Sequence, residues 1–242
     1  MSGTGVIRVG MSGFSYPEWI GDFYPPKTKR EKFLEYYATR FDAVEINMTF
    51  RRDPKPITIE RWRDAVPPDF RFTFKAHMRI THWLRLVNTD SAVAEFLELL
   101  RPMGSKLGAV LFQVAATLKF DPAVLDTFCG SLPPGPVYAF EPRDESYGSA
   151  EFHDVLKRHG VARCINDYFE DAAAPAVTSP TAYFRFHREE YSGEDIEQRA
   201  ALVKSIADAG SDVYAFFAHE DNPESVRPAL MFQDLVKTDR DR

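Results

Sequence analysis

Short runs rich in Val, Ile, Phe or Tyr recur along the chain, and each is bounded by Gly, Pro, Asp or Ser. Runs of this length and composition predict β-strands. Eight of them follow one another: Ile7–Gly10, Ala43–Asn47, Phe70–Ala76, Gly108–Val114, Val137–Glu141, Ala162–Asp167, Ala182–His187 and Val213–His219. The pattern therefore predicts eight short strands.

Most of the predicted strands are followed by apolar residues at helical spacing. Helices are predicted at Thr28–Arg40, Thr58–Ala65, Asp90–Leu100, Asp121–Phe128, Ser149–His159, Ser192–Ala209 and Asn222–Val236. Asp121 followed by Pro122 is typical of a helix start, and Gly160 is typical of the residue just after a helix end. The Ala and Pro residues of the segment Tyr168–Pro180 predict a loop in place of a helix after the sixth strand.

Strands that alternate with helices predict parallel βαβ units. Eight such units in 242 residues fit a closed (β/α)8 barrel, which typically needs about 250 residues. No linker or repeat interrupts the pattern. We expect one α/β domain over residues 1–242, a TIM barrel at about 7–236, with short flexible termini and short or irregular helices after strands 2 and 6.

Composition narrows the class of protein and of partner. Hydrophobic residues make up 44% of the chain and aromatic residues 14%, enough for a sizeable core. The net charge of −6 does not indicate a nucleic acid or an anionic membrane as a partner. The cysteines, Cys129 and Cys164, are too few for a disulfide framework. No signal-peptide core and no long apolar run occurs, so we expect a cytoplasmic protein; the oligomeric state stays open.

Polar and charged residues gather where the predicted strands end. In a (β/α)8 barrel the C-terminal strand ends, here called the mouth, carry the chemistry. Four of these residues are catalytic candidates: Glu45, Lys75, Glu141 and His187. The predicted substrate-binding residues are Ser12, Tyr16, Asn47, His77, Arg79, His82, Gln113, Arg143, Asp167, Arg185 and His219. Their recurrence at consecutive strand ends predicts a pocket.

Local context suggests how some of these side chains are used. Glu45 lies inside an apolar run, so we expect it to face the barrel interior and to pair with Lys75. Asp167 has an alternative interpretation as a helix or loop cap. The Gly- and Ser-rich segment Gly10–Tyr16 is able to present backbone amides to an anion, although it matches no phosphate-binding motif.

Several distinctive motifs occur in order along the chain: Gly10-Met11-Ser12-Gly13, Trp19–Pro25, Val44–Phe50, Phe74-Lys75-Ala76, Thr81-His82 and Tyr183–His187. Together they resemble the domain of unknown function 72 (YecE-like) family from about Ile7 to Leu235. The resemblance implies a TIM barrel, in agreement with the strand count, and it brings no established reaction. Departures from the family pattern, such as Phe14 where members carry Trp, cluster at the predicted mouth.

The leading hypothesis is an enzyme that performs acid–base chemistry on a small anionic or hydroxylated substrate, phosphorylated compounds included. Glu45 or Glu141 would act as the base, and His187 would act as the acid because the pKa of imidazole lies near neutrality. The lysine and arginine side chains of the mouth would hold the anion. No cofactor is predicted for this reaction.

Three alternatives stay open. A metal-dependent hydrolase or phosphodiesterase would use the mouth carboxylates and imidazoles as ligands to a divalent metal, although Lys75 and Arg185 would repel a cation. Schiff-base chemistry at Lys75 would require its pKa to be lowered, and a neighbouring Glu45 would oppose this. The fourth hypothesis is a non-catalytic ligand-binding or scaffold barrel, because the fold alone does not determine a function.

Overall fold

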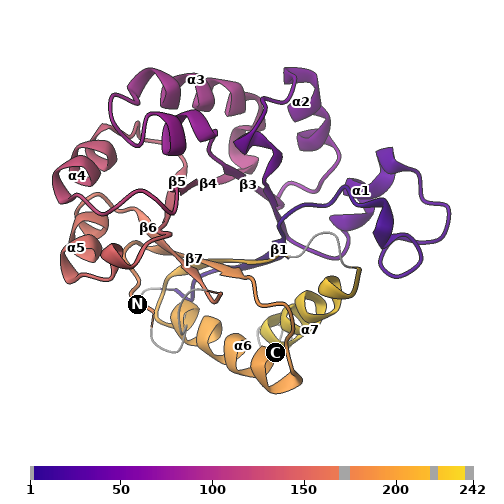
Figure 1. Ribbon diagram of the computed structural model, residues 1–242. Helices are drawn as coiled ribbons and strands as arrows, with labels where there is room; N and C mark the ends of the chain where they lie inside the picture. The colour runs from indigo at the N-terminus through magenta and orange to yellow at the C-terminus, as the bar shows by residue number, and fades with distance from the viewer. Residues whose placement is uncertain (1–2, 169–174, 219–222, 238–242) are drawn as a thin grey trace.

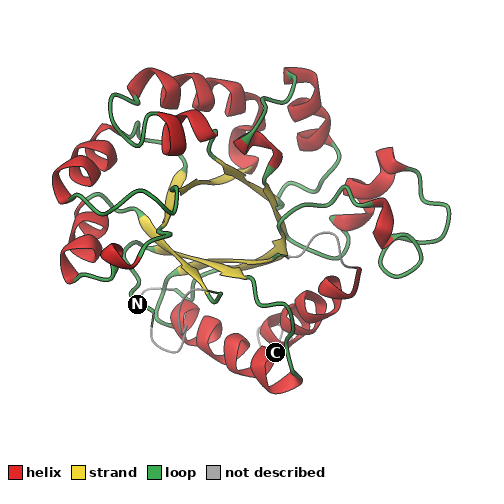
Figure 2. Cartoon of the chain, viewed as in Figure 1, coloured by secondary structure: helices red, strands yellow, loops and turns green. Residues whose placement is uncertain are grey.

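The computed structural model describes residues 3–168, 175–218 and 223–237 of the chain. Eight parallel strands close into a barrel in sequence order, with β1 paired to both β2 and β8. Figure 2 shows them as a ring enclosed by helices. The strands are β1 (Ile7–Met11), β2 (Ala43–Ile46), β3 (Arg71–Lys75), β4 (Leu107–Gln113), β5 (Val137–Glu141), β6 (Ala162–Asn166), β7 (Thr181–Phe186) and β8 (Asp212–Phe217). The predicted (β/α)8 architecture is confirmed.

The helices lie outside the strands, and the segment that carries α1 projects from the ring (Figure 1). They are α1 (Phe33–Tyr37), α2 (Pro56–Asp64), α3 (Asp90–Leu100), α4 (Pro122–Ser131), α5 (Ala150–Arg158), α6 (Gly193–Asp208) and α7 (Val226–Lys237). Within the described ranges no helix is both long and apolar enough to cross a membrane.

Local capping explains why the helix starts could be placed from sequence. The Asp121 carboxylate accepts hydrogen bonds from two backbone amides at the start of α4, and Ser149 caps α5 through Phe152 N. Ser192 and Asp195 form a reciprocal capping box at the start of α6. Each of these groups satisfies amides that have no partner inside the helix.

The first helix is shorter than predicted. The segment expected to be helical over 28–40 contains a 3-10 turn at Arg30–Lys32 and then only Phe33–Tyr37 as α-helix. The Tyr37 hydroxyl donates to Ala43 O and accepts from Met11 N. This buried contact ties the helix end to β1 and β2, so the chain turns directly into β2. Between β6 and β7 the described residues contain no helix, and residues 169–174 of the predicted loop lie outside the described residues.

The barrel wall separates two apolar regions. Inside it, small residues such as Ala109 and Ala139 pack around Tyr183, Tyr214 and Phe216. A larger core rich in phenylalanine fills the space between the strands and the helices. Because aromatic rings fill the barrel interior, the polar residues at the mouth lie on a packed base and not over an open channel.

Candidate active site at the barrel mouth

A buried arginine joins two buried carboxylates across the mouth. Arg185 Nη1 lies 2.9 Å from Glu141 Oε2, and its Nη2 and Nε each lie 3.1 Å from Glu45 Oε1. Both glutamates are 0% exposed and Arg185 is 3% exposed. Burial would lower the pKa of Arg185, but the two carboxylates hold it well above its ordinary value. Arg185 therefore stays charged, and both carboxylates are already paired with it.

Glu45 also accepts hydrogen bonds from Ser12, which directly follows β1, and from Tyr183 of β7. Ser12 Oγ donates to Glu45 Oε1 at 2.8 Å, and the Tyr183 hydroxyl donates to Glu45 Oε2 at 2.6 Å. The predicted pairing of Glu45 with Lys75 is therefore wrong, because Arg185, Tyr183 and Ser12 occupy both carboxylate oxygens. The Ser12 amide donates to Phe217 O and so does not face a ligand.

Glu141 also accepts several hydrogen bonds. Gln113 Nε2 and Asn166 Nδ2 each donate to it at 2.9 Å, and Arg143 Nη1 lies 3.6 Å from Oε1. Burial would raise the pKa of Glu141, but Arg185, Gln113 and Asn166 outweigh burial and lower it. The carboxylate stays charged at neutral pH and has little remaining capacity to accept a proton.

Lys75 is an amine of this site whose pKa is shifted toward neutrality. Its Nζ donates to Gln113 Oε1 at 2.7 Å and lies 4.2 Å from the centre of the Phe50 ring. Burial, followed by the charge of Arg185, lowers the pKa of Lys75 to about 8. The nearby Glu141 and Glu45 only partly offset this effect, because Arg185 neutralises them.

The loop after β3 adds imidazole groups above Lys75. Burial and the charges of Lys75 and Arg143 lower the pKa of His82, so its ring is neutral at neutral pH. His82 stands edge-on to Phe50 with a centroid distance of 4.9 Å. His77 Nδ1 accepts from the Arg79 amide. This loop contains a π-helical turn at Arg79–Trp83, a feature that is frequent at functional sites.

Other predicted site residues point elsewhere or are only partly placed. Asp167 binds Arg199 of α6 at 2.7 Å and the His187 amide at 2.7 Å, which matches its structural alternative. Arg79 pairs with Glu95 at the surface. The His187 ring lies beside Tyr168, with centroids 6.2 Å apart. His219 lies outside the described residues.

Two predicted residues, Asn47 and Tyr16, lie on the β1–β2 side of the mouth. Asn47 Nδ2 donates to Ser12 O at 3.4 Å, and the Tyr16 hydroxyl donates to the same oxygen at 3.2 Å. Sequence reasoning missed Tyr183 as a contact of Glu45. The alternation of β7 places Tyr183 on the same face as Arg185, so this signal was present in the sequence.

The two carboxylates do not fit a divalent metal. Arg185 lies between them and binds both, so a cation at that point would meet a guanidinium. Among the described residues, no group of three or more His, Cys, Asp or Glu side chains is arranged to hold a metal ion. The side chains that would bind the metal in the hydrolase hypothesis are also held apart, because Asp167 is bound to Arg199 of α6.

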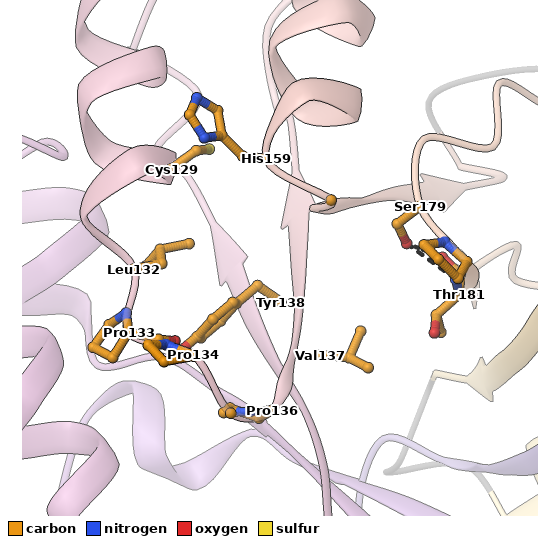
Figure 3. Close-up of a pocket in the computed structure, with 13 residues that line it drawn as sticks. Cys129, Leu132, Pro133, Pro134, Pro136, Val137, Tyr138, His159, Ser179 and Thr181 are labelled. Atoms are coloured by element: carbon orange, nitrogen blue, oxygen red, sulfur yellow. Dashed lines mark hydrogen bonds between the residues drawn. The ribbon is translucent and has the colours of Figure 1, made fainter.

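A further pocket of about 350 Å³ lies at the opposite end of the barrel, where β5, β6 and β7 begin. Figure 3 shows Pro133, Pro134, Pro136 and Tyr138 along one side of it. No Asp, Glu, Lys or Arg side chain lines this pocket, and burial raises the pKa of the Cys129 thiol to about 12. This pocket lacks the reactive groups that the mouth brings together.

Comparison with known proteins places the chain in a family. A protein family of unknown function, DUF72, matches residues 8–242. The UPF0759 protein YecE of Escherichia coli O157:H7 is 29% identical over 220 residues, which cover 89% of this chain and 75% of that protein. YecE of Escherichia coli K12 is 34% identical over 170 residues, which cover 67% of this chain and 59% of that protein.

Solved structures agree with this match. A DUF72 family protein from Thermotoga maritima superposes with a TM-score of 0.83 at 25% identity, covering 96% of this chain and 99% of that one. A DUF72 family protein from Enterococcus faecalis gives a TM-score of 0.79 at 21% identity, covering 98% of this chain and 99% of that one, and supports the fold alone. The chain belongs to the DUF72 family of TIM-barrel proteins, a family of unknown function.

Proposed function

We propose that the chain is an enzyme that performs acid–base chemistry on a small anionic substrate at the barrel mouth. Lys75 transfers the proton, and Arg143 binds the anionic group of the substrate. The observation that carries this proposal is the environment of Lys75, a partly buried amine held by the neutral Gln113 amide. Its pKa of about 8 lies near the value that suits a general acid or base at neutral pH.

The glutamates take a different part from the one expected from the sequence. Glu45 and Glu141 are buried, and both accept several hydrogen bonds. A carboxylate in this state is a poor proton acceptor, because its lone pairs are engaged and its charge is stabilised. We therefore assign Glu45, Glu141 and Arg185 to positioning and to the electrostatic field of the site.

The charge balance favours an anion. Glu45 and Glu141 carry two negative charges, and one of these is balanced by the buried Arg185. Lys75 and Arg143 then leave the site with a net positive charge whenever Lys75 is protonated. The Arg143 side chain is 29% exposed, so its guanidinium is accessible to a ligand and suits bidentate binding of a carboxylate or phosphate. The neutral His82 is the second proton-transfer group of this proposal.

Proton exchange in deuterated water tests the proposal without a known reaction. Wild-type protein is incubated with a panel of small keto acids, hydroxy acids and sugar phosphates, and loss of C–H signals is followed by NMR. We expect exchange in at least one compound and a decrease of about 10²-fold or more in Lys75→Met. Lys119→Met, at an exposed lysine paired with Asp144, is the matched control. Absence of exchange across the panel, or an undiminished rate in Lys75→Met, would refute the proposal.

A second candidate reaction is imine formation at Lys75, which the lowered pKa favours because more of the amine is unprotonated at neutral pH. The amine adds to a substrate carbonyl, and loss of water leaves a carbon–nitrogen double bond. Borohydride reduces such an imine to a stable secondary amine. A mass gain on the peptide that contains Lys75 supports this reaction, and an unmodified peptide in the presence of a compound that undergoes exchange contradicts it.

A further inference from the structure

A groove of about 760 Å³ lies beside the mouth, between α2 and the segment that leads from β1 to α1. Its floor includes Ile46, Asn47 and Met48 at the end of β2. Ser12 and Asn47 line the groove, and Ser12 also binds Glu45 of the central site. The groove therefore begins at the edge of the mouth and extends outward. Its volume lies in the range of small-molecule sites.

One face of α2 forms a wall of this groove. Thr58, Arg61, Trp62 and Ala65 line it, and their spacing of three, four and seven residues places them on one stripe of the helix. The stripe combines a guanidinium with an indole ring. Trp62 packs against the core and is half-buried, so part of its ring stays accessible, and Arg61 is exposed.

The groove is locally basic in a chain whose net charge is −6. Three arginines line it, Arg30, Arg52 and Arg61, against one carboxylate, Glu31. Arg30 is oriented by Ser15, whose Oγ accepts from Arg30 Nε at 3.2 Å. In the part of the chain that the structure describes, neither Arg52 nor Arg61 forms an ion pair. Their guanidinium groups are thus available to an anion.

The other wall supplies a second ring in a constrained position. The Tyr16 hydroxyl donates to Ser12 O, and the ring packs against Trp19 at a centroid distance of 4.9 Å. Gly13 has a φ of +133°, and a Cβ there would lie 2.2 Å from the Tyr16 hydroxyl oxygen. The loop therefore needs glycine to fold around Tyr16. Trp62 is likewise held edge-on by Phe14 at 6.1 Å.

We propose that this groove binds the nucleoside phosphate part of a substrate, with the phosphate on Arg52 and Arg61 and the base on Trp62. Guanidinium groups bind phosphate with charge-assisted, bidentate hydrogen bonds, and aromatic side chains stack on bases. The groove alone requires only that a mononucleotide binds. The statement that the reacting end then reaches Lys75 rests on the proposed function of the mouth.

Calorimetric titration of the full chain with AMP, adenosine and inorganic phosphate tests this proposal. We expect AMP to bind at least about tenfold more tightly than either fragment, because each fragment fills only part of the groove. Arg52→Ala and Arg61→Ala should each weaken AMP binding about tenfold or more, in line with the loss of a charge-assisted contact. Arg40→Ala, at an exposed arginine outside the groove, is the matched control and should leave the affinity unchanged.

A further variant separates the ring from the phosphate. Trp62→Leu keeps apolar bulk, so it should weaken binding of AMP and leave binding of inorganic phosphate unchanged; circular dichroism checks that the variant is folded. Equal affinities for AMP and phosphate, or no saturable binding of AMP, would overturn the proposal.

The two proposals fail separately. Lys75→Met should retain AMP binding even where it abolishes proton exchange, since Lys75 does not line the groove. If AMP binds and no compound of the panel undergoes exchange, the groove assignment stands and the catalytic assignment falls. If exchange occurs and AMP does not bind, the catalytic assignment stands and the groove assignment falls.

Discussion

Two networks of buried carboxylates and arginines lie close together in this barrel. In the central network Arg185 bridges Glu45 and Glu141 at the mouth, and in the peripheral network Arg199 of α6 binds Asp167 behind the strands. In both networks the carboxylates are fully buried and their distances to the arginines are about 3 Å or less. From burial and pairing alone, the two would be given the same significance.

The difference lies in what adjoins each network. The peripheral pair is closed by Tyr191, whose hydroxyl contacts both oxygens of Asp167, and by the His187 amide. It joins β6, β7 and α6. Arg188, 42% exposed, also lies 3.9 Å from Asp167 Oδ2 and pairs with Asp195. The central network adjoins Arg143 through Glu141 and, through Gln113, the amine of Lys75. A buried ion pair therefore indicates structure, and the central site is distinguished by Lys75, an amine that is held by a neutral amide and whose pKa is lowered to about 8.

The largest change in the free energy of unfolding is expected when the central network is broken. Arg185→Met would leave two buried carboxylates without their shared cation, so we expect a loss of about 3–5 kcal/mol in the free energy of unfolding. Urea denaturation measures it. The loss should shrink as the pH falls, since protonation of the glutamates removes the uncompensated charge. A loss below about 1 kcal/mol would show that the network contributes little.

Breaking the peripheral network should cost less. Arg199→Met leaves Asp167 with Tyr191, the His187 amide and the more distant Arg188, so we expect a loss of about 2–3 kcal/mol. The same variant should retain wild-type proton exchange once it is folded, in contrast to Lys75→Met. A folded Arg199→Met protein without exchange would place Asp167 in the reaction and remove the distinction between the two networks.

The pH dependence of stability that arises from Lys75 provides a further test of how the two networks differ. Its pKa is about 8 in the folded protein and near 10.5 in the unfolded chain, so the unfolded chain binds the proton more tightly. The amine therefore destabilises the fold below pH 8, and the free energy of unfolding rises with pH between the two values. Allowing for partial exposure of the side chain, we expect a rise of about 1–2 kcal/mol.

This rise should be absent in Lys75→Met. The measurement is the difference in unfolding free energy between wild type and variant at pH 7 and pH 10, and Lys119→Met controls for the loss of any lysine. A pH-independent difference would mean that the pKa of Lys75 is not lowered. Proton exchange by the wild-type protein should likewise increase with pH and level off above about 8.

The smallest effect is expected at the surface. Arg79 and Glu95 form an ion pair 2.8 Å long, with side chains 44% and 63% exposed. Such pairs contribute little, so Arg79→Ala should change the free energy of unfolding by less than about 0.5 kcal/mol. Proton exchange should be unaffected. A selective loss of exchange in Arg79→Ala would restore this residue to the substrate-binding set predicted from sequence.

The architecture was accessible from the sequence because its signals are local. Each strand is a short apolar run, and helix starts such as Asp121 and Ser149 are marked by caps that bind amides two or three residues away. The first helix was overestimated for the same reason. The contacts of Tyr37 that end it reach to Met11 and Ala43, which helical spacing does not reveal.

The sequence by itself determined the barrel, and it determined that Glu45, Lys75, Glu141 and Arg185 end their strands at one mouth. Only the tertiary structure decided which of these groups are paired. Arg185 and Tyr183 reach Glu45 across separations of 140 and 138 residues, and no local pattern encodes such distances. The closed barrel places Arg185, and not Lys75, against Glu45. The amine is left beside a neutral amide, and the chemistry that we propose depends on this arrangement.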